Sequence, residues 1–167
     1  IPRWHLFGGS WGSTLSLAYA MRYPEHCIGM ILRSIFLMEQ IEIDWYIHGM
    51  QTIFPEAWDA FASYAGGNDI LRIYLQRLTS QDDAEAIEAA LHWNAYETAC
   101  ASFFPQKETL TSDDQKYYAL AMAKIEAHYF ATQVIPPEKS LLLGIDKIRS
   151  IPTTIIQGRY DIVCPMA

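Results

Sequence analysis

The feature that most constrains this chain is a glycine-rich turn, GGSWG at residues 8–12, which stands between an apolar strand and a helix. Residues 2–7 have the length and apolar character of a short buried strand, and residues 11–23 have apolar positions at helical spacing. Pro24 closes that helix, and a second apolar run follows at residues 28–32. A strand, a helix and a strand in this order predict a βαβ unit and therefore a parallel sheet.

The turn itself has the pattern G-x-S-x-G. A sharp strand-to-helix turn of this kind holds its serine in a strained backbone conformation and exposes the hydroxyl. Gly8 and Gly12 are expected to let the strand and the helix approach without a side-chain collision. The backbone N–H of Trp11 lies at the positive end of the predicted helix, where it can donate to an oxyanion. The pattern therefore predicts Ser10 as the nucleophile of a serine hydrolase, against the alternative of a plain glycine-serine turn.

The two ends of the chain differ from its middle in the secondary structure that their sequence patterns predict. Residues 38–140 contain segments of helix length and no convincing strand, whereas residues 151–158 again have the pattern of a buried strand. We therefore expect an α/β-hydrolase core over residues 1–37 and 141–167, with a mostly parallel sheet and a helical cap inserted between its strands. Because the chain starts almost inside a strand and stops just after another, we expect it to be a fragment that lacks further parts of the core.

Helix signals in the middle segment are specific at several positions. Pro55 fits the start of a helix, and residues 82–101 and 113–130 are strongly helical. Ser112 fits the N-cap of the second of these helices. The inserted segment is too long to be an ordinary loop, which supports its interpretation as a separate cap.

Asp161 directly follows the predicted strand at residues 151–158, in the sequence GRYD. In α/β-hydrolases the nucleophile is followed in the chain by the acid and then by the histidine. Asp161 therefore fits the acid that orients the imidazole and stabilises the imidazolium, and the alternative is a simple turn aspartate. All five histidines precede it, and His128, the one candidate among them, would reverse the chain order. We expect the base and the second oxyanion donor to lie outside this chain.

Two glutamates of the predicted cap lie in apolar stripes. Steps of three and four residues place Glu97 and Glu126 each on an otherwise apolar helix face. The stripes consist of Ala86, Ala90, Trp93 and Cys100 around Glu97, and of Ala119, Met122 and Phe130 around Glu126. Burying a carboxylate is costly unless it is paired, and the cations of the cap fall off these stripes. One hypothesis is that both carboxylates bind a cation of the substrate, such as a free α-ammonium; the alternative is that they reach solvent or pair with an arginine.

Composition excludes several classes of partner. The net charge of −7 disfavours nucleic acid and anionic membrane surfaces. No apolar run approaches the roughly 18–20 residues that a membrane span requires, and residues 1–9 do not have the pattern expected of a signal peptide. The cysteines, Cys27, Cys100 and Cys164, are odd in number and far apart, so neither a disulfide framework nor a zinc site is expected. This favours a reduced, cytoplasmic setting.

Taken together, these motifs resemble the prolyl aminopeptidases, also called proline iminopeptidases, over essentially the whole chain. GGSWGSTLSLAYAMRYPE and ILRSIFL are similar to the elbow, first helix and following strand of that family, and IEAHYF and IIQGRYD are similar to its cap and acid-loop motifs. The resemblance implies an α/β-hydrolase that releases N-terminal proline from peptides through an acyl-enzyme, without a metal or another cofactor. It implies Ser10 as nucleophile and Asp161 as acid.

The resemblance also implies a binding site. Glu126, within IEAHYF, and Glu97 match carboxylates that grip the N-terminal amine of the substrate. Phe36, within RSIF, and Tyr46, within DWYIHG, would line a pocket for the pyrrolidine ring, although aromatic residues of this kind are more usually core. The alternatives are another cap-bearing hydrolase, such as an esterase or an amidase, and a non-catalytic fragment.

Overall fold

The computed structural model describes residues 1–104 and 110–166. The chain forms two compact units. The first, here called the sheet unit, combines Ile1–Ile43 with Ile135–Ala167, and the second, the helical unit, is Asp44–Val134. The helical unit is thus inserted into the sequence of the sheet unit. It begins at Asp44 rather than at residue 38, and it ends at Val134 rather than at residue 140.

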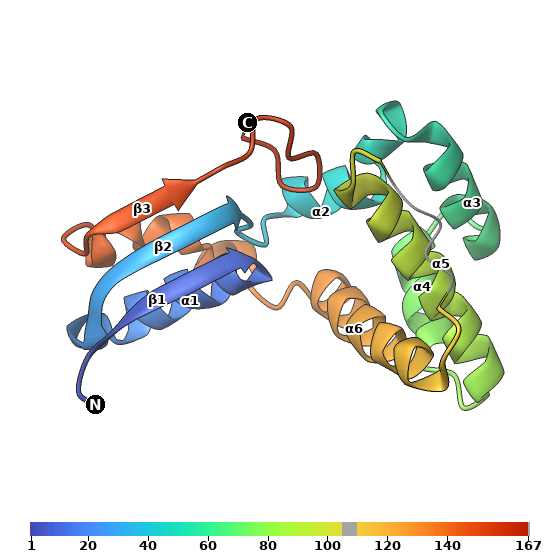
Figure 1. The fold of residues 1–167 in the computed structure, drawn as a ribbon, viewed down its shortest axis with the longest axis horizontal. Helices are drawn as coiled ribbons and strands as arrows, with labels where there is room; N and C mark the ends of the chain where they lie inside the picture. The colour runs from blue at the N-terminus through green and yellow to red at the C-terminus, as the bar shows by residue number, and fades with distance from the viewer. Residues whose placement is uncertain (105–109, 167) are drawn as a thin grey trace. The chain divides into compact units, whose positions relative to one another are not determined.

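The sheet unit contains a parallel three-stranded sheet in the order β1-β2-β3 (Figure 1). Strand β1 (Trp4–Ser10) leads directly into α1 (Trp11–Arg22), which is followed by β2 (Cys27–Ile35). Strand β3 (Thr153–Ile156) comes after the helical unit in the chain. The predicted βαβ unit and the parallel sheet are therefore confirmed.

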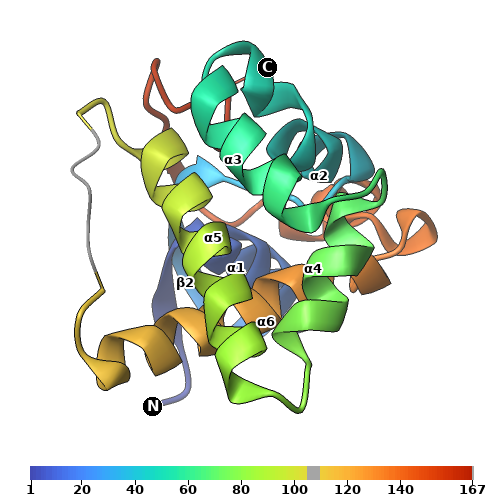
Figure 2. The ribbon, with the colours of Figure 1, turned by 90° about the vertical axis from the view of Figure 1, so that its right-hand side faces the viewer.

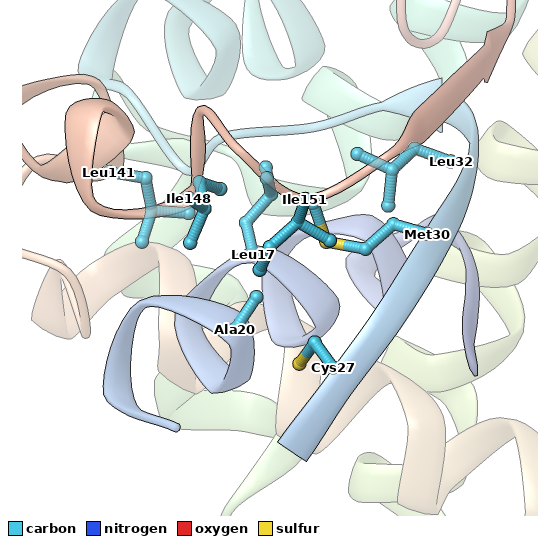
Figure 3. Close-up of a cluster of buried hydrophobic side chains, with 8 residues drawn as sticks. All are labelled: Leu17, Ala20, Cys27, Met30, Leu32, Leu141, Ile148 and Ile151. Carbon is cyan, nitrogen blue, oxygen red and sulfur yellow. The ribbon is translucent and has the colours of Figure 1, made fainter. Parts of the chain in front are cut away.

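The core of the sheet unit lies between α1, β2 and a 3₁₀ segment, Leu141–Ile148, that sequence reasoning did not predict. Figure 3 shows the side chains that pack together there, which are Leu17, Ala20, Cys27, Met30, Leu32, Leu141, Ile148 and Ile151. Each large apolar side chain buried in this way stabilises the fold by about 1.5–3 kcal/mol. Because α1 and β2 pack together in this core, the start of α1, and with it the turn that joins β1 to α1, is held in place.

The outer strands are more exposed than their sequences predict. Phe7 in β1 is 72% exposed and Ile155 in β3 is 60% exposed, and all four residues of β3 are exposed. The prediction that both strands are buried is therefore wrong for the described residues. The physical reason is that β1 and β3 are the outer strands of this sheet, and α1 and the segment Leu141–Ile148 lie on one face of it (Figure 1).

The described residues of the helical unit form helices and one 3₁₀ turn, Gly49–Thr52, and include no strand. Helix α5 packs against α3, α4 and α6, and α4 also packs against α6 (Figure 2). The helices are α2 (Gln40–Ile47, which crosses the boundary between the units), α3 (Pro55–Ala65), α4 (Ile70–Leu78), α5 (Asp83–Ala101) and α6 (Asp113–Thr132). Among residues 1–104 and 110–166, no helix is long and apolar enough to cross a membrane.

Local sequence explains where these helices begin and end. Pro55 occupies the first turn of α3, and Gly66, with φ of 72°, ends that helix in the left-handed conformation that glycine adopts readily. Asp82 caps α5 by accepting from a backbone N–H. Ser112 caps α6 and forms a capping box with Gln115. The starts of α3, α5 and α6 agree with the sequence-based prediction.

Candidate active site

Ser10 occupies a strained position between β1 and α1. It is the last residue of the strand and the N-cap of the helix, with φ of 53° and ψ of −125°. A positive φ is unfavourable for a residue with a Cβ, and such strain is concentrated at functional sites. Its side chain is exposed rather than used as a helix cap. Trp11 begins α1, so its backbone N–H lies at the positive end of the helix dipole.

The two glycines of the turn differ in what they make possible. A Cβ at Gly8 would lie 2.1 Å from the carbonyl oxygen of Gly12 and 2.5 Å from Ser16 Oγ, so no other residue fits at that position without a shift. At Gly12 a Cβ would meet nothing within 4 Å. The steric reason expected for Gly12 therefore does not hold, because the close approach runs from Gly8 to the backbone carbonyl of Gly12.

Buried hydroxyls in the first turn of α1 hold the elbow to the segment after β2. Ser13 Oγ donates to the carbonyl oxygen of Ser10 at 2.6 Å, and the backbone N–H of Phe36 donates to Ser13 Oγ at 3.0 Å. Thr14 Oγ1 donates to the carbonyl oxygen of Phe36. Ser13 and Thr14 are fully buried. Phe36, a predicted pocket residue, is half-buried and is thereby fixed to the helix that follows Ser10.

Asp161 lies in the loop after β3, within the sheet unit, and both of its carboxylate oxygens accept hydrogen bonds. Oδ1 accepts from the backbone N–H of Cys164 at 2.9 Å, and Oδ2 accepts from Gln157 Nε2 at 3.2 Å. The thiol of Cys164 forms a side-chain hydrogen bond with Ser10. Burial, and then the charge of Asp161, raise the pKa of this thiol to about 11. Cys164 is therefore a neighbour of both Ser10 and Asp161, a role that its place in the sequence does not indicate.

No described histidine serves these two residues as a base. None of the five forms a hydrogen bond to Ser10 or Asp161 in residues 1–104 and 110–166. His128, the candidate with reversed chain order, is exposed on α6 of the helical unit. The expectation that the base lies outside this chain stays a prediction.

Glu97 and Glu126 form a separate candidate site, on two packed helices of the helical unit. Glu97 lies on α5 and Glu126 on α6, and both are partly buried. Burial, and then the charge of Glu126, raise the pKa of Glu97 to about 7. Burial also raises the pKa of Glu126, and a hydrogen bond opposes this shift: Trp93 Nε1 donates to Glu126 Oε2 at 2.9 Å. The two carboxyls therefore interact and compete for one proton.

The carboxylates have no cationic partner among the residues that the structure describes. Arg72 pairs instead with Asp69, and Arg77 donates to the carbonyl oxygen of Tyr64 at the end of α3. Neither Glu97 nor Glu126 forms an ion pair within residues 1–104 and 110–166. Two partly buried carboxylates that lack a protein cation are a suitable receptor for an ammonium group.

The helix faces around the two glutamates correspond only in part to the predicted stripes. On α5 the expected residues are buried, and they are Ala86, Ala90, Trp93 and Cys100. On α6, Met122 is 41% exposed, and the buried face contains Ala119, Leu120, Ala123 and Ala127 instead. The prediction for Met122 is wrong because small alanines at four-residue steps, rather than the larger side chains, let α6 pack closely on its neighbours. Glu126 lies beside this face.

Tyr46 is buried in an aromatic cluster next to the carboxylates. Its ring contacts those of Trp93, Tyr96 and Phe130, with centroids 5.3–5.7 Å apart. Its hydroxyl is buried and, within the described part of the chain, has no hydrogen-bond partner. Burial, together with the charges of Glu97 and Glu126, raises its pKa well above the usual value. An unpartnered hydroxyl beside two carboxylates adds a third polar group able to accept or donate to a ligand.

In residues 1–104 and 110–166 the possible metal ligands do not cluster and the cysteines are not paired. No group of three or more histidine, cysteine, aspartate or glutamate side chains within residues 1–104 and 110–166 is placed to hold a metal ion. The three cysteines are buried and free.

Comparison with known proteins gives one matching family model and several similar proteins that carry the same name. A family model described as the alpha/beta hydrolase fold matches residues 1–167. The chain is 42% identical over 172 residues to a proline iminopeptidase of Arabidopsis thaliana, covering 99% of this chain and 45% of that protein. It is 43% identical over 173 residues to a probable proline iminopeptidase of Leptolyngbya boryana, with 99% and 53% covered. It is 40% identical over 172 residues to a proline iminopeptidase of Neisseria gonorrhoeae, with 99% and 54% covered. The chain spans about half the length of these curated relatives.

Proposed function

Since the chain belongs to the alpha/beta hydrolase fold family, we propose that the full-length protein containing it is a serine aminopeptidase that releases N-terminal proline from peptides. The observation that carries this proposal is the strained, exposed Ser10 at the junction of β1 and α1. The substrate class is supported by the carboxylates of Glu97 and Glu126, which lack a described cation, and by relatives named proline iminopeptidases. The proposed location is the cytoplasm.

The proposed reaction proceeds through an acyl-enzyme. Ser10 Oγ attacks the carbonyl carbon of the N-terminal proline while its proton passes to a histidine outside this chain, and the N–H of Trp11 donates to the oxyanion. The C–N bond then breaks, and the histidine gives its proton to the leaving amine. Water, deprotonated by the same histidine, attacks the ester; the bond from the acyl carbon to Ser10 Oγ then breaks, the histidine returns the proton to Oγ, and proline is released. Asp161 orients the histidine and stabilises its charged form.

The proposed specificity follows from charge. The ammonium of an N-terminal proline pairs with Glu97 and Glu126, whereas a proline inside a peptide carries no charge and would leave both carboxylates unsatisfied. Phe36 and Tyr46 are proposed to line the site of the pyrrolidine ring. Tyr46 is buried together with its hydroxyl, which has no partner among the described residues, and this unpaired hydroxyl is the group proposed to face the substrate.

The test compares two substrates in the full-length protein: a chromogenic amide of proline with a free amine, and a neutral chromogenic ester. Glu126→Gln removes one carboxylate charge, so kcat/KM for the amide should fall by about 100-fold or more while that for the ester changes little. Glu56→Gln, at an exposed position of α3, is the matched control and should leave both substrates unaffected.

Equal losses on the two substrates, or no loss on either, would contradict the aminopeptidase assignment and favour another cap-bearing hydrolase, such as an esterase or an amidase. Ser10→Ala identifies the background rate in the same assays. If this variant turned over both substrates as fast as the wild type, Ser10 would not be the nucleophile of any hydrolase reaction here.

A further inference from the structure

One side-chain amide, that of Gln157, joins three parts of the sheet unit. Gln157 directly follows β3, four residues before Asp161. Its Oε1 accepts from the backbone N–H of Ile35 at 3.0 Å. Its Nε2 donates to Asp161 Oδ2 at 3.2 Å and to the carbonyl oxygen of Cys164 at 2.6 Å. The partners fix the orientation of the amide, because a donor faces one of its atoms and two acceptors face the other.

The partner on β2 connects this amide to the nucleophile. In the parallel pairing of β1 with β2, Ile35 is the register partner of Ser10. The bond from Ile35 to Gln157 therefore ties the acid loop to the strand position opposite Ser10. This tie spans 122 residues of sequence, across the whole helical unit.

The carboxylate of Asp161 is held from two sides. The N–H of Cys164 donates to one oxygen and Gln157 donates to the other. Two donors on two different oxygens fix the plane of a carboxylate, which decides where its remaining lone pairs point. Gln157 also donates to the carbonyl oxygen of Cys164, so that this one side chain holds the loop that contains Asp161 at both of its ends.

We propose that Gln157 is a positioning residue: it sets the orientation of the Asp161 carboxylate and holds the acid loop to the end of β2, opposite Ser10. The inference rests on the proposed function, because Asp161 orients a base only if the protein is a serine hydrolase. Gln157 is not proposed to contact the substrate or the base. Its effect is on the rate of the chemical steps rather than on binding.

Two variants of the full-length protein separate this role from simple loop stability. Gln157→Glu keeps the length of the side chain and an acceptor for Ile35, but it replaces the donor to Asp161 with a second carboxylate oxygen. Gln157→Met removes all three hydrogen bonds without adding a charge. Gln76→Glu makes the same chemical change at an exposed position of α4 and is the matched control.

The measurements are kcat and KM for a chromogenic amide of proline, the rate at which a fluorophosphonate probe labels Ser10, and the thermal unfolding midpoint. Misplacing a catalytic group by about 1 Å costs about 100-fold, so kcat and labelling should fall about 10- to 100-fold in both Gln157 variants. KM should stay within about twofold of the wild type, and the control should match the wild type.

Several outcomes would overturn the proposal. Rates within about threefold of the wild type in folded variants would do so, as would a loss expressed only in KM. Failure of both variants to fold would make Gln157 a structural residue and equally overturn it. The proposed function fails separately: a wild type that is labelled at Ser10 but leaves the proline amide intact refutes the substrate, while the labelling rates still decide the role of Gln157. A wild type that is not labelled at Ser10 refutes both.

Discussion

At Ser10 the backbone φ of 53° costs about 1–3 kcal/mol in a residue with a side chain, and the surrounding hydrogen bonds must maintain it. The carbonyl of Ser10 accepts from the buried Ser13, which in turn accepts from the backbone of Phe36. The carboxylate of Glu126 is likewise held by one neighbour, the indole of Trp93. Ser10, which is proposed to react, and Glu126, which is proposed to bind the substrate, are therefore each held by a buried donor that takes no part in reaction or binding.

Replacing Trp93 tests this dependence. Trp93→Phe removes the donor to Glu126, so the pKa of Glu126 should rise further and a smaller fraction of this carboxyl should be ionised and able to pair with an ammonium. A hydrogen bond to a charged group is worth about 1.5–3 kcal/mol, which predicts a rise in KM for a proline amide of about tenfold or more, with kcat little changed.

Trp58→Phe provides the matched control for that experiment. Trp58 lies in the same unit and donates its indole N–H to a backbone carbonyl, that of Ile47, rather than to a carboxylate. The same rise in KM in both variants, or no rise in Trp93→Phe, would show that the hydrogen bond from the indole to Glu126 does not support substrate binding. The substrate constants are measured by steady-state kinetics on the full-length protein.

At the scale of elements, the contact of β1 with α1 depends on Gly8. Gly8→Ala would place a methyl group 2.1 Å from a backbone carbonyl, so we expect a loss of about 3 kcal/mol or more in the free energy of unfolding. Gly12→Ala meets no described atom within 4 Å and lies in a helix, where alanine is favoured by up to about 1 kcal/mol. Urea unfolding of the two variants should therefore give opposite signs, and equal destabilisation would contradict the geometry of the turn.

The pairing of α5 with α6 predicts a pH dependence. In the folded protein the pKa of Glu97 is raised from 4.5 to about 7, so the folded state keeps a proton that the unfolded chain has lost. The stabilisation due to this proton is complete below about pH 4.5 and is lost as the pH rises to about 7. Between pH 5 and pH 8, the free energy of unfolding of Glu97→Gln should therefore rise by roughly 1–3 kcal/mol relative to that of the wild type.

Urea unfolding at the two pH values measures this gain. Glu85→Gln, at an exposed position of the same helix, controls for the loss of one charge. If the difference in the free energy of unfolding between Glu97→Gln and the wild type were the same at both pH values, the pKa of Glu97 would not be raised in the folded protein.

Local sequence was sufficient to predict the βαβ unit, the starts of α3, α5 and α6, and the turn at Ser10, because each depends on residues close together in the chain. It did not predict the 3₁₀ segment Leu141–Ile148, which packs against α1 in the core of the sheet unit. Nor did it predict the bonds of Gln157 to Ile35 and of Trp93 to Glu126, which join residues 122 and 33 positions apart. Periodicity carries no information about such pairs.

At the scale of the whole molecule, the chain is two compact units, and each carries one part of the proposed chemistry. The sheet unit holds Ser10 and Asp161, joined through Cys164 and Gln157, while the helical unit holds Glu97 and Glu126. The first part predicts acyl transfer and the second predicts recognition of a free amine. Their combination in one protein is what distinguishes an aminopeptidase from a general hydrolase.

Observation of the acyl-enzyme tests directly whether Ser10 is the nucleophile of a prolyl aminopeptidase. The full-length protein is mixed rapidly with a chromogenic ester of proline, the reaction is quenched, and the peptides are analysed by mass spectrometry. We expect a burst of chromophore equal to the amount of enzyme, a prolyl group on the hydroxyl of Ser10, and neither signal in Ser10→Ala. Turnover of the ester with the prolyl group on another residue, or undiminished turnover in Ser10→Ala, would contradict it.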